Sequence, residues 1–251
     1  MRLSLEGKVA LITGGGRDIG RKICEQIAAE GAIIAVNYNS SLDEAGECVE
    51  FIKKRAGNAV AYEASISDYN QVKSMVDRII SDHGRIDILI NNAGYVKSQK
   101  FVETTPEDWK SQIDTCLYGA IHCCHVVAPH FIRQKNGRIV NIVGDSSRIG
   151  EANISMGAAS RGGTIALGKS LAKELGRYNI TVNTVSLGLV RTSHSDTAFL
   201  SKNMKNIVRS YPLRRIGMPE DVAPTVVFLA SETAGWITGQ VISVNGGYSM
   251  V

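Results

Sequence analysis

The sequence lacks the features that would assign it to a membrane, a secretory or a nucleic-acid-binding class. It contains no window of about 18 apolar residues, which a membrane-spanning helix requires. The segment 1–8 has no apolar core of the kind that a signal peptide carries. The formal charge of +4 is spread along the chain, and its one short basic stretch, Arg209–Arg215, is typical of a solvated surface or an anion contact. We therefore expect neither a membrane nor a nucleic acid as a partner.

The sequence also lacks a cysteine pattern suited to disulfides. Its five cysteines are odd in number and fall mostly within apolar helical patterns, which indicates reduced thiols and a cytoplasmic protein. Residues 122–125, His-Cys-Cys-His, suggest a metal site at first sight. Neighbouring residues on a helix point about 100° apart, so only His122 and His125 share a face, and zinc would need further ligands from elsewhere. We expect a packed helix face and no metal.

The positive signal begins with a regular alternation of strands and helices. Seven short apolar runs predict strands buried on both faces: 8–13, 32–37, 59–64, 86–91, 138–143, 180–185 and 241–244. Helical spacing covers 19–30, 69–82, 107–133 and 158–175, with Gly31, Gly84 and Gly176 at expected helix ends. Such alternation predicts an α/β fold with a doubly wound, Rossmann-like parallel sheet of about seven strands and helices on both faces. No linker interrupts it, so residues 1–251 are expected to form one domain.

A glycine-rich loop at residues 13–20, Thr-Gly-Gly-Gly-Arg-Asp-Ile-Gly, joins the first strand to the first helix. Glycines there let backbone N–H groups approach a pyrophosphate at a helix N-terminus. The loop resembles the T-G-x-x-x-G-x-G of the short-chain dehydrogenase/reductase family, and the resemblance continues through N-N-A-G at 91–94 to V-N-G-G at 244–247. It implies an NAD(P) site at Thr13, Gly14, Arg17, Gly20, Asn91, Ala93 and Gly94.

Several positions in that implied site are unfavourable. Asp18 stands where the family has its middle glycine, and a carboxylate about 4 Å from a phosphate costs about 4 kcal/mol at an effective dielectric near 20. Alternatively, Asp18 turns outward and caps the helix. Ser65 replaces the aspartate that usually binds adenine, and residues 36–39 offer no acid for a ribose diol. Arg17 is placed to meet a 2′-phosphate, although Asn39 replaces the usual second basic residue. We therefore expect weak NAD(P) binding or none, with the choice between NAD and NADP open.

The resemblance also locates the family's catalytic Asn, Ser, Tyr and Lys. Registering the chain on 137–142 and 169–171 places the Ser, Tyr and Lys positions, without gaps, at Gly144, Gly157 and Arg161. The predicted helical segment 109–117 places the Asn position at Cys116. No tyrosine lies between Tyr118 and Tyr178, so no realignment restores the general acid. Arg161 keeps a positive charge but has no phenol to tune. Because loss of general acid/base catalysis alone costs about 10²–10⁴ in rate, this pattern predicts that no catalytic residue remains. The segment 145–148 is expected to be an ordinary polar loop.

The catalytic residues are replaced, whereas the predicted helices that pair subunits in the family keep their apolar residues. This combination suggests a subunit that supports a catalytic partner. We expect a catalytically silent subunit in a heterotetramer with an active homologous dehydrogenase, which would hold the NAD(P). This resembles the paired subunits of anaerobic toluene breakdown, in which one partner oxidises a hydroxybenzylsuccinyl-CoA. The segment 189–218 corresponds to the family's substrate loop. Two other hypotheses stay open, an active NAD(P)-dependent reductase with an unorthodox site and a module that senses a nucleotide or an acyl ligand.

Overall fold

A single parallel sheet organises the chain. The computed structural model describes residues 3, 5–193, 195 and 197–251. Seven strands run in the order β3-β2-β1-β4-β5-β6-β7, and all their pairings are parallel. The strands are β1 (Val9–Ile12), β2 (Ile33–Tyr38), β3 (Asn58–Glu63), β4 (Ile88–Asn91), β5 (Gly137–Gly144), β6 (Ile180–Leu187) and β7 (Val241–Val244). The predicted doubly wound α/β fold is confirmed.

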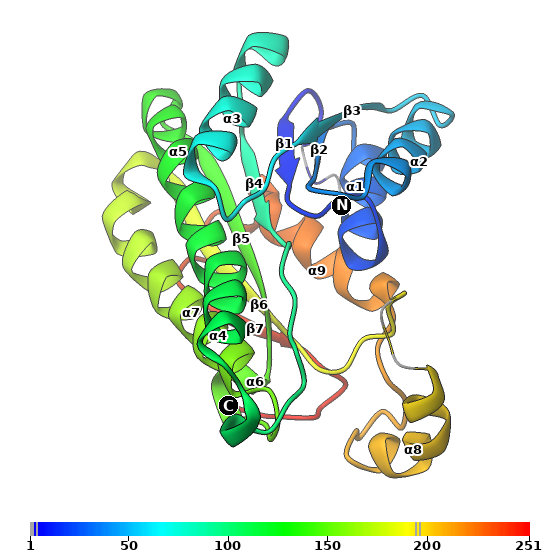
Figure 1. Ribbon diagram of the computed structural model, residues 1–251. Helices are drawn as coiled ribbons and strands as arrows, with labels where there is room; N and C mark the ends of the chain where they lie inside the picture. Colours follow the sequence, from blue (N-terminus) through cyan, green and yellow to red (C-terminus); the bar gives the residue numbers. More distant parts are fainter. Residues whose placement is uncertain (1–2, 4, 194, 196) are drawn as a thin grey trace.

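Helices cover both faces of this sheet (Figure 1). The helices are α1 (Asp18–Ala29), α2 (Leu42–Lys53), α3 (Tyr69–His83), α4 (Pro106–Ile113), α5 (Gly119–Gln134), α6 (Ser146–Ile149), α7 (Ser155–Leu175), α8 (Thr197–Arg209) and α9 (Pro219–Ala230). Helices α1, α2 and α9 pack on one face, whereas α3, α5 and α7 pack on the other. Helix α8 stands away from the sheet, beyond the end of β6 (Figure 1). None of the described helices is long and apolar enough to cross a membrane.

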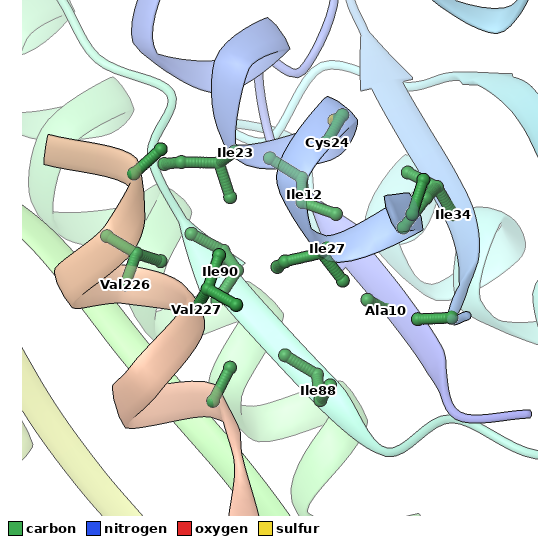
Figure 2. Close-up of a cluster of buried hydrophobic side chains, with 14 of the residues drawn as sticks. Ala10, Ile12, Ile23, Cys24, Ile27, Ile34, Ile88, Ile90, Val226 and Val227 are labelled. Carbon is green, nitrogen blue, oxygen red and sulfur yellow. The ribbon is translucent and has the colours of Figure 1, made fainter. Parts of the chain in front are cut away.

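Two apolar clusters, one on each face, hold the layers together. On the face shown in Figure 2, Ile23 and Ile27 of α1 meet Val226 of α9 above the isoleucines of the central strands. All of these side chains have no more than 1% exposure, which explains why the strands read as continuous apolar runs. The clusters fix the strand ends, and the loops at those ends form the site.

One predicted helix is wrong in detail, and one predicted helix end is confirmed. The continuous helix expected over 107–133 is interrupted between α4 and α5 by a π-helical segment, Asp114–Tyr118, which contains Cys116. Such π-segments occur frequently at functional sites. Gly176 is the C-cap of α7, as predicted; its φ is −55°, and the chain continues as a 3₁₀ turn, Gly176–Tyr178. The left-handed residue is Asn179, with φ 59°.

Candidate active site

The candidate site lies at the carboxyl ends of β1 and β4, where the strand order reverses direction. Ligands of open α/β sheets bind in the crevice outside such a switch point. Here the glycine-rich loop 13–20 meets the segment 91–94. Oγ1 of Thr13 accepts hydrogen bonds from the backbone N–H groups of Asn92 and Ala93, at 2.9 and 3.0 Å. The Asn92 side chain donates to the carbonyls of Thr13 and Gly14, at 3.0 and 3.1 Å. The structure thus brings the two predicted cofactor segments together.

The glycine-rich loop requires its glycines at two positions. Gly14 has φ +60°, a left-handed conformation that favours glycine. A Cβ on Gly20 would lie 2.1 Å from the carbonyl oxygen of Gly14, so only glycine lets α1 start so close to the loop. Arg17 is the residue that precedes α1, and its side chain makes no capping hydrogen bond. The N–H groups of the first turn of α1, which a helix leaves without internal partners, are therefore open to an anion such as a pyrophosphate.

Asp18 does not cap α1, which was the alternative expected from the sequence. It is the first helical residue rather than the cap, and its φ of +50° keeps the backbone conformation of a glycine. Its carboxylate accepts hydrogen bonds from the backbone N–H and the Oγ of Ser193, at 2.7 and 2.8 Å. Both carboxylate oxygens are thus used to join α1 to the segment 189–218. Residues 194 and 196 of that segment lie outside the described residues.

The adenine side of the crevice is lined by polar groups that already have partners. Arg17 lies 3.6 Å from the carboxylate of Glu44 in an ion pair in which both side chains are more than 40% exposed. Surface pairs of this kind contribute little, so the pair presents a small barrier to a competing phosphate. The Oγ of Ser65 lies 2.8 Å from that of Ser67. Asn37, at the end of β2, donates to the carbonyl of Ala64 and accepts from the N–H of Gly14, so it is a structural residue.

The four registered catalytic positions lie around the same crevice. Cys116 comes from the π-helical segment, Gly144 ends β5, and Gly157 and Arg161 are one turn apart on α7. A Cβ on Gly94 would lie 3.0 Å from Nη2 of Arg161 and 3.2 Å from Sγ of Cys116. A Cβ on Gly144 would lie 3.7 Å from Nη1 of Arg161. Arg161 and Cys116 are therefore neighbours, and the guanidinium lies against Gly94 and close to Gly144.

Gly157 faces a different side chain. A Cβ there would lie 2.7 Å from Cγ2 of Val96, in the loop after β4, so Val96 fills part of the space that a residue 157 side chain would use. Cys116 is 6% exposed, and its Sγ donates to the carbonyl of Tyr95 at 3.3 Å. Neither position therefore offers a free acidic proton to the crevice. No residue supplies the general acid of the family at the place where the family has it.

Arg161 is the one cation at these positions, and it is half-buried. Among the described residues it has no hydrogen-bond acceptor and no acidic partner. Beneath it lies a cavity of about 10 Å³ whose lining includes Arg161, Cys116, Thr164 and Asn91. That volume suits about one water molecule, and the buried Oδ1 of Asn91 has no partner in the described part of the chain. An unpaired guanidinium in this setting favours a negatively charged oxygen as its ligand.

The segment 145–148 is not the ordinary polar loop that we expected. Asp145 is 2% exposed, and the residues after it form the short helix α6. Its carboxylate accepts from Oγ of Ser186 at 2.6 Å, Nδ2 of Asn245 at 2.5 Å and Oγ of Ser249 at 2.7 Å. It therefore joins the ends of β5 and β6 to the C-terminal turn. The sequence carried no signal for this because the three partners are far away along the chain.

Residues 122–125 do not gather ligands. Both histidines lie against Tyr69, with ring centroids 5.6 and 5.7 Å from its ring, as expected for a shared helix face. Cys123 and Cys124 are buried on the other side, where burial raises the pKa of both thiols, that of Cys124 to about 12. Within the described ranges no group of three or more His, Cys, Asp or Glu side chains is placed to hold a metal.

Comparison with known proteins identifies relatives over nearly the whole chain. Residues 14–249 match the family described as Enoyl-(Acyl carrier protein) reductase. The 3-oxoacyl-(acyl-carrier-protein) reductase FabG of Staphylococcus epidermidis is 40% identical over 247 residues, 97% of this chain and 99% of the relative. Its namesake in Thermotoga maritima is 36% identical over 248 residues, 98% of this chain and 99% of the relative. A solved structure from Sinorhizobium meliloti, assigned as a short-chain alcohol dehydrogenase, is 29% identical, with a TM-score of 0.94 and coverage of 99% of this chain and 98% of that one.

These relatives correct the functional prediction. The expectation of a catalytically silent subunit is wrong, because proteins named as reductases match the chain at 36–40% identity over nearly its full length. Nothing in the matches supports a pseudoenzyme, a hetero-oligomer or the paired subunits of toluene breakdown. The error came from treating four replaced side chains as the loss of all chemistry. Hydride transfer also depends on positioning and on charge stabilisation, and Arg161 retains the charge. Association with a homologous subunit stays a prediction.

Proposed function

The chain belongs to the short-chain dehydrogenase/reductase family, and we propose that it is an active NAD(P)-dependent oxidoreductase with an unorthodox site. Its reaction is the interconversion of a ketone and a secondary alcohol on an acyl thioester, the class of substrate indicated by the names of its relatives. One observation carries the proposal. The guanidinium of Arg161 lies between Gly94 and Gly144, in the crevice that the glycine-rich loop and the segment 91–94 form together.

The residues present fit the cofactor. The uncapped N-terminus of α1 would hold the pyrophosphate, and Gly14 and Gly20 let the backbone come close to it. Arg17 would exchange Glu44 for a 2′-phosphate, which favours NADP over NAD. The carboxylate of Asp18 is compensated by two hydrogen bonds from Ser193, so its repulsion of a phosphate is smaller than that of a free carboxylate. When bound, the nicotinamide supplies the hydride.

Arg161 supplies the electrostatic part of the reaction. As a ketone is reduced, negative charge develops on its oxygen, and a fixed cation beside that oxygen lowers the barrier. The guanidinium stabilises the alkoxide as a charged hydrogen-bond donor, and the transferred proton needs another source. Position 157 has no phenol, and the thiol of Cys116 donates its hydrogen bond to the backbone carbonyl of Tyr95. The proton therefore comes from water. We therefore expect turnover about 10²–10⁴ slower than with a positioned general acid.

The test is turnover by the purified chain alone. Acetoacetyl-CoA is offered with NADPH or NADH, and oxidation of the nicotinamide is followed by absorbance. The proposal predicts slow, enzyme-dependent oxidation, faster with NADPH, that Arg161→Gln abolishes and Lys169→Gln preserves. Lys169 is a matched control because it is an exposed cation two turns further along α7. Absence of turnover by a folded protein that demonstrably binds NADPH would refute the proposal.

A further inference from the structure

One long-range contact ties the glycine-rich loop to the chain that follows β6. The carboxylate of Asp18, in the first turn of α1, accepts hydrogen bonds from the backbone N–H and the Oγ of Ser193, at 2.7 and 2.8 Å. Asp18 has a left-handed φ of +50°, which aspartate adopts more readily than most residues. We call this pair of residues the clasp. Ser193 is exposed, so water competes for its two donors and the clasp is able to open.

The clasp holds a segment that crosses the candidate site. Ser193 lies six residues beyond Leu187, the end of β6, and in the sheet β5 and β4 stand between β6 and β1. Three steps between neighbouring strands span about 14 Å, and six extended residues reach about 20 Å. The segment 188–193 therefore passes the carboxyl ends of β5 and β4, where the crevice lies. Figure 1 shows it running from β6 toward the side of the sheet where α1 and α9 lie.

The beginning of this segment is held independently of the clasp. Gly217 donates its N–H to the carbonyl of Leu189 and accepts from the N–H of Arg191, both at 2.9 Å. The hydroxyl of Tyr211 accepts from the N–H of Leu189 at 2.8 Å. Loss of the clasp would thus release the segment at Ser193 while its beginning stays in place.

The charge of Asp18 makes the closed clasp compatible with a bound dinucleotide. A pyrophosphate at the N-terminus of α1 would lie near this carboxylate, and the two donors of Ser193 stabilise the negative charge there. The clasp should therefore be closed both in the free protein and over bound NAD(P). Loops that close over a ligand commonly set the rate at which the ligand leaves.

We propose that the clasp controls the exchange of NAD(P), because the dinucleotide enters and leaves only when Asp18 and Ser193 separate. Asp18, which stands where the family has glycine, is thus a positioning residue for the segment 188–193. The inference rests on the proposed function for the identity of the ligand, whereas the clasp itself is a contact within the chain.

Stopped-flow fluorescence of NADPH binding to the purified whole protein tests the clasp without turnover. Ser193→Ala removes the Oγ donor and keeps the charge of Asp18. Because the clasp is closed with and without the ligand, this variant should raise the association and dissociation rate constants alike, by about 3- to 10-fold, the effect of one hydrogen bond. Ser74→Ala, at an exposed serine on α3, is the matched control and should change neither rate constant.

Hydrogen–deuterium exchange of the protein without NADPH checks the contact itself. The backbone N–H of Ser193 donates to Asp18, so its exchange should be about 10-fold faster in Asp18→Gly than in the wild type. Glycine suits the φ of +50° at this position, so the variant keeps the backbone of the loop.

Three outcomes would overturn the inference. They are slower or unchanged association of NADPH in Ser193→Ala, unchanged exchange at Ser193 in Asp18→Gly, and failure of every variant to bind NADPH. Slower association would show that Asp18 acts only by repelling phosphate, because loss of a donor leaves its charge less compensated. Faster association and dissociation in Ser193→Ala, in a protein that does not reduce acetoacetyl-CoA, would support the clasp and refute the proposed function.

Discussion

Placing a phenol at position 157 should accelerate the reaction, because it adds a proton donor beside the cation of Arg161. A tyrosine there would stand one helical turn before Arg161, and residues four apart on a helix are neighbours. The guanidinium would lower the pKa of the phenol toward neutrality by favouring its charged form. The obstacle is Val96, whose Cγ2 and Cγ1 lie 2.7 and 3.0 Å from a Cβ at this position. Val96 is 37% exposed in a loop, so Val96→Ala clears the space without opening the core.

The expected gain follows from the contribution of general acid catalysis. The double variant Gly157→Tyr with Val96→Ala should raise kcat about 10²–10⁴-fold, equivalent to about 3–5 kcal/mol of barrier. Oxidation of NADPH with acetoacetyl-CoA measures the gain. Gly157→Phe with Val96→Ala is the matched control, because it adds the same ring without the hydroxyl. Equal rates for the Tyr and Phe variants, with both proteins folded and NADPH bound, would show that the missing phenol is not what limits this site.

Three further predictions concern stability, the cofactor loop and the thiols. Asp145→Asn should lower the free energy of unfolding, measured in urea, by about 2–4 kcal/mol, because an amide cannot accept all three hydrogen bonds that the carboxylate accepts. The control is Asp77→Asn, which removes an exposed ion pair with Lys73 and should change the free energy of unfolding by less than about 1 kcal/mol. Gly20→Ala should abolish NADPH binding in a fluorescence titration, because its Cβ would meet the Gly14 carbonyl; unchanged affinity would contradict the placement of the loop. Burial raises the pKa of the Cys123 and Cys124 thiols, so at neutral pH they should react with a disulfide reagent only when urea unfolds the protein, and rapid labelling in the native state would contradict their burial.

The fold was predictable because its main signal is local. Strands buried on both faces read as continuous apolar runs, and all seven were predicted with ends within about two residues of those observed. The misses concern features set by tertiary contacts. The π-helical segment at 114–118 breaks a periodicity that continues on both sides of it. The helix end at Gly176 was predicted correctly, but the 3₁₀ turn that follows it and ends at the left-handed Asn179 was not.

The site was predictable in position but not in contacts. Register located Gly144, Gly157 and Arg161, because no gap separates them from the matched segments, and the predicted helical segment 109–117 located Cys116. The partner of Asp18, Ser193, is 175 residues away, and no local pattern reports it. The chemistry was mispredicted for a related reason. A list of replaced side chains shows what is missing, whereas the open donors of Arg161 become apparent only when its neighbours are known.

The most direct test of the account follows the hydride itself. The purified chain is incubated with acetoacetyl-CoA and NADPH that carries deuterium at the transferable position, and the product thioester is analysed by mass spectrometry. The account predicts a 3-hydroxyacyl product that contains one deuterium, formed slowly by the wild-type chain and not by Arg161→Gln. If the protein binds NADPH but the product contains no more deuterium than in a reaction without enzyme, the claim that this chain is an active reductase is contradicted.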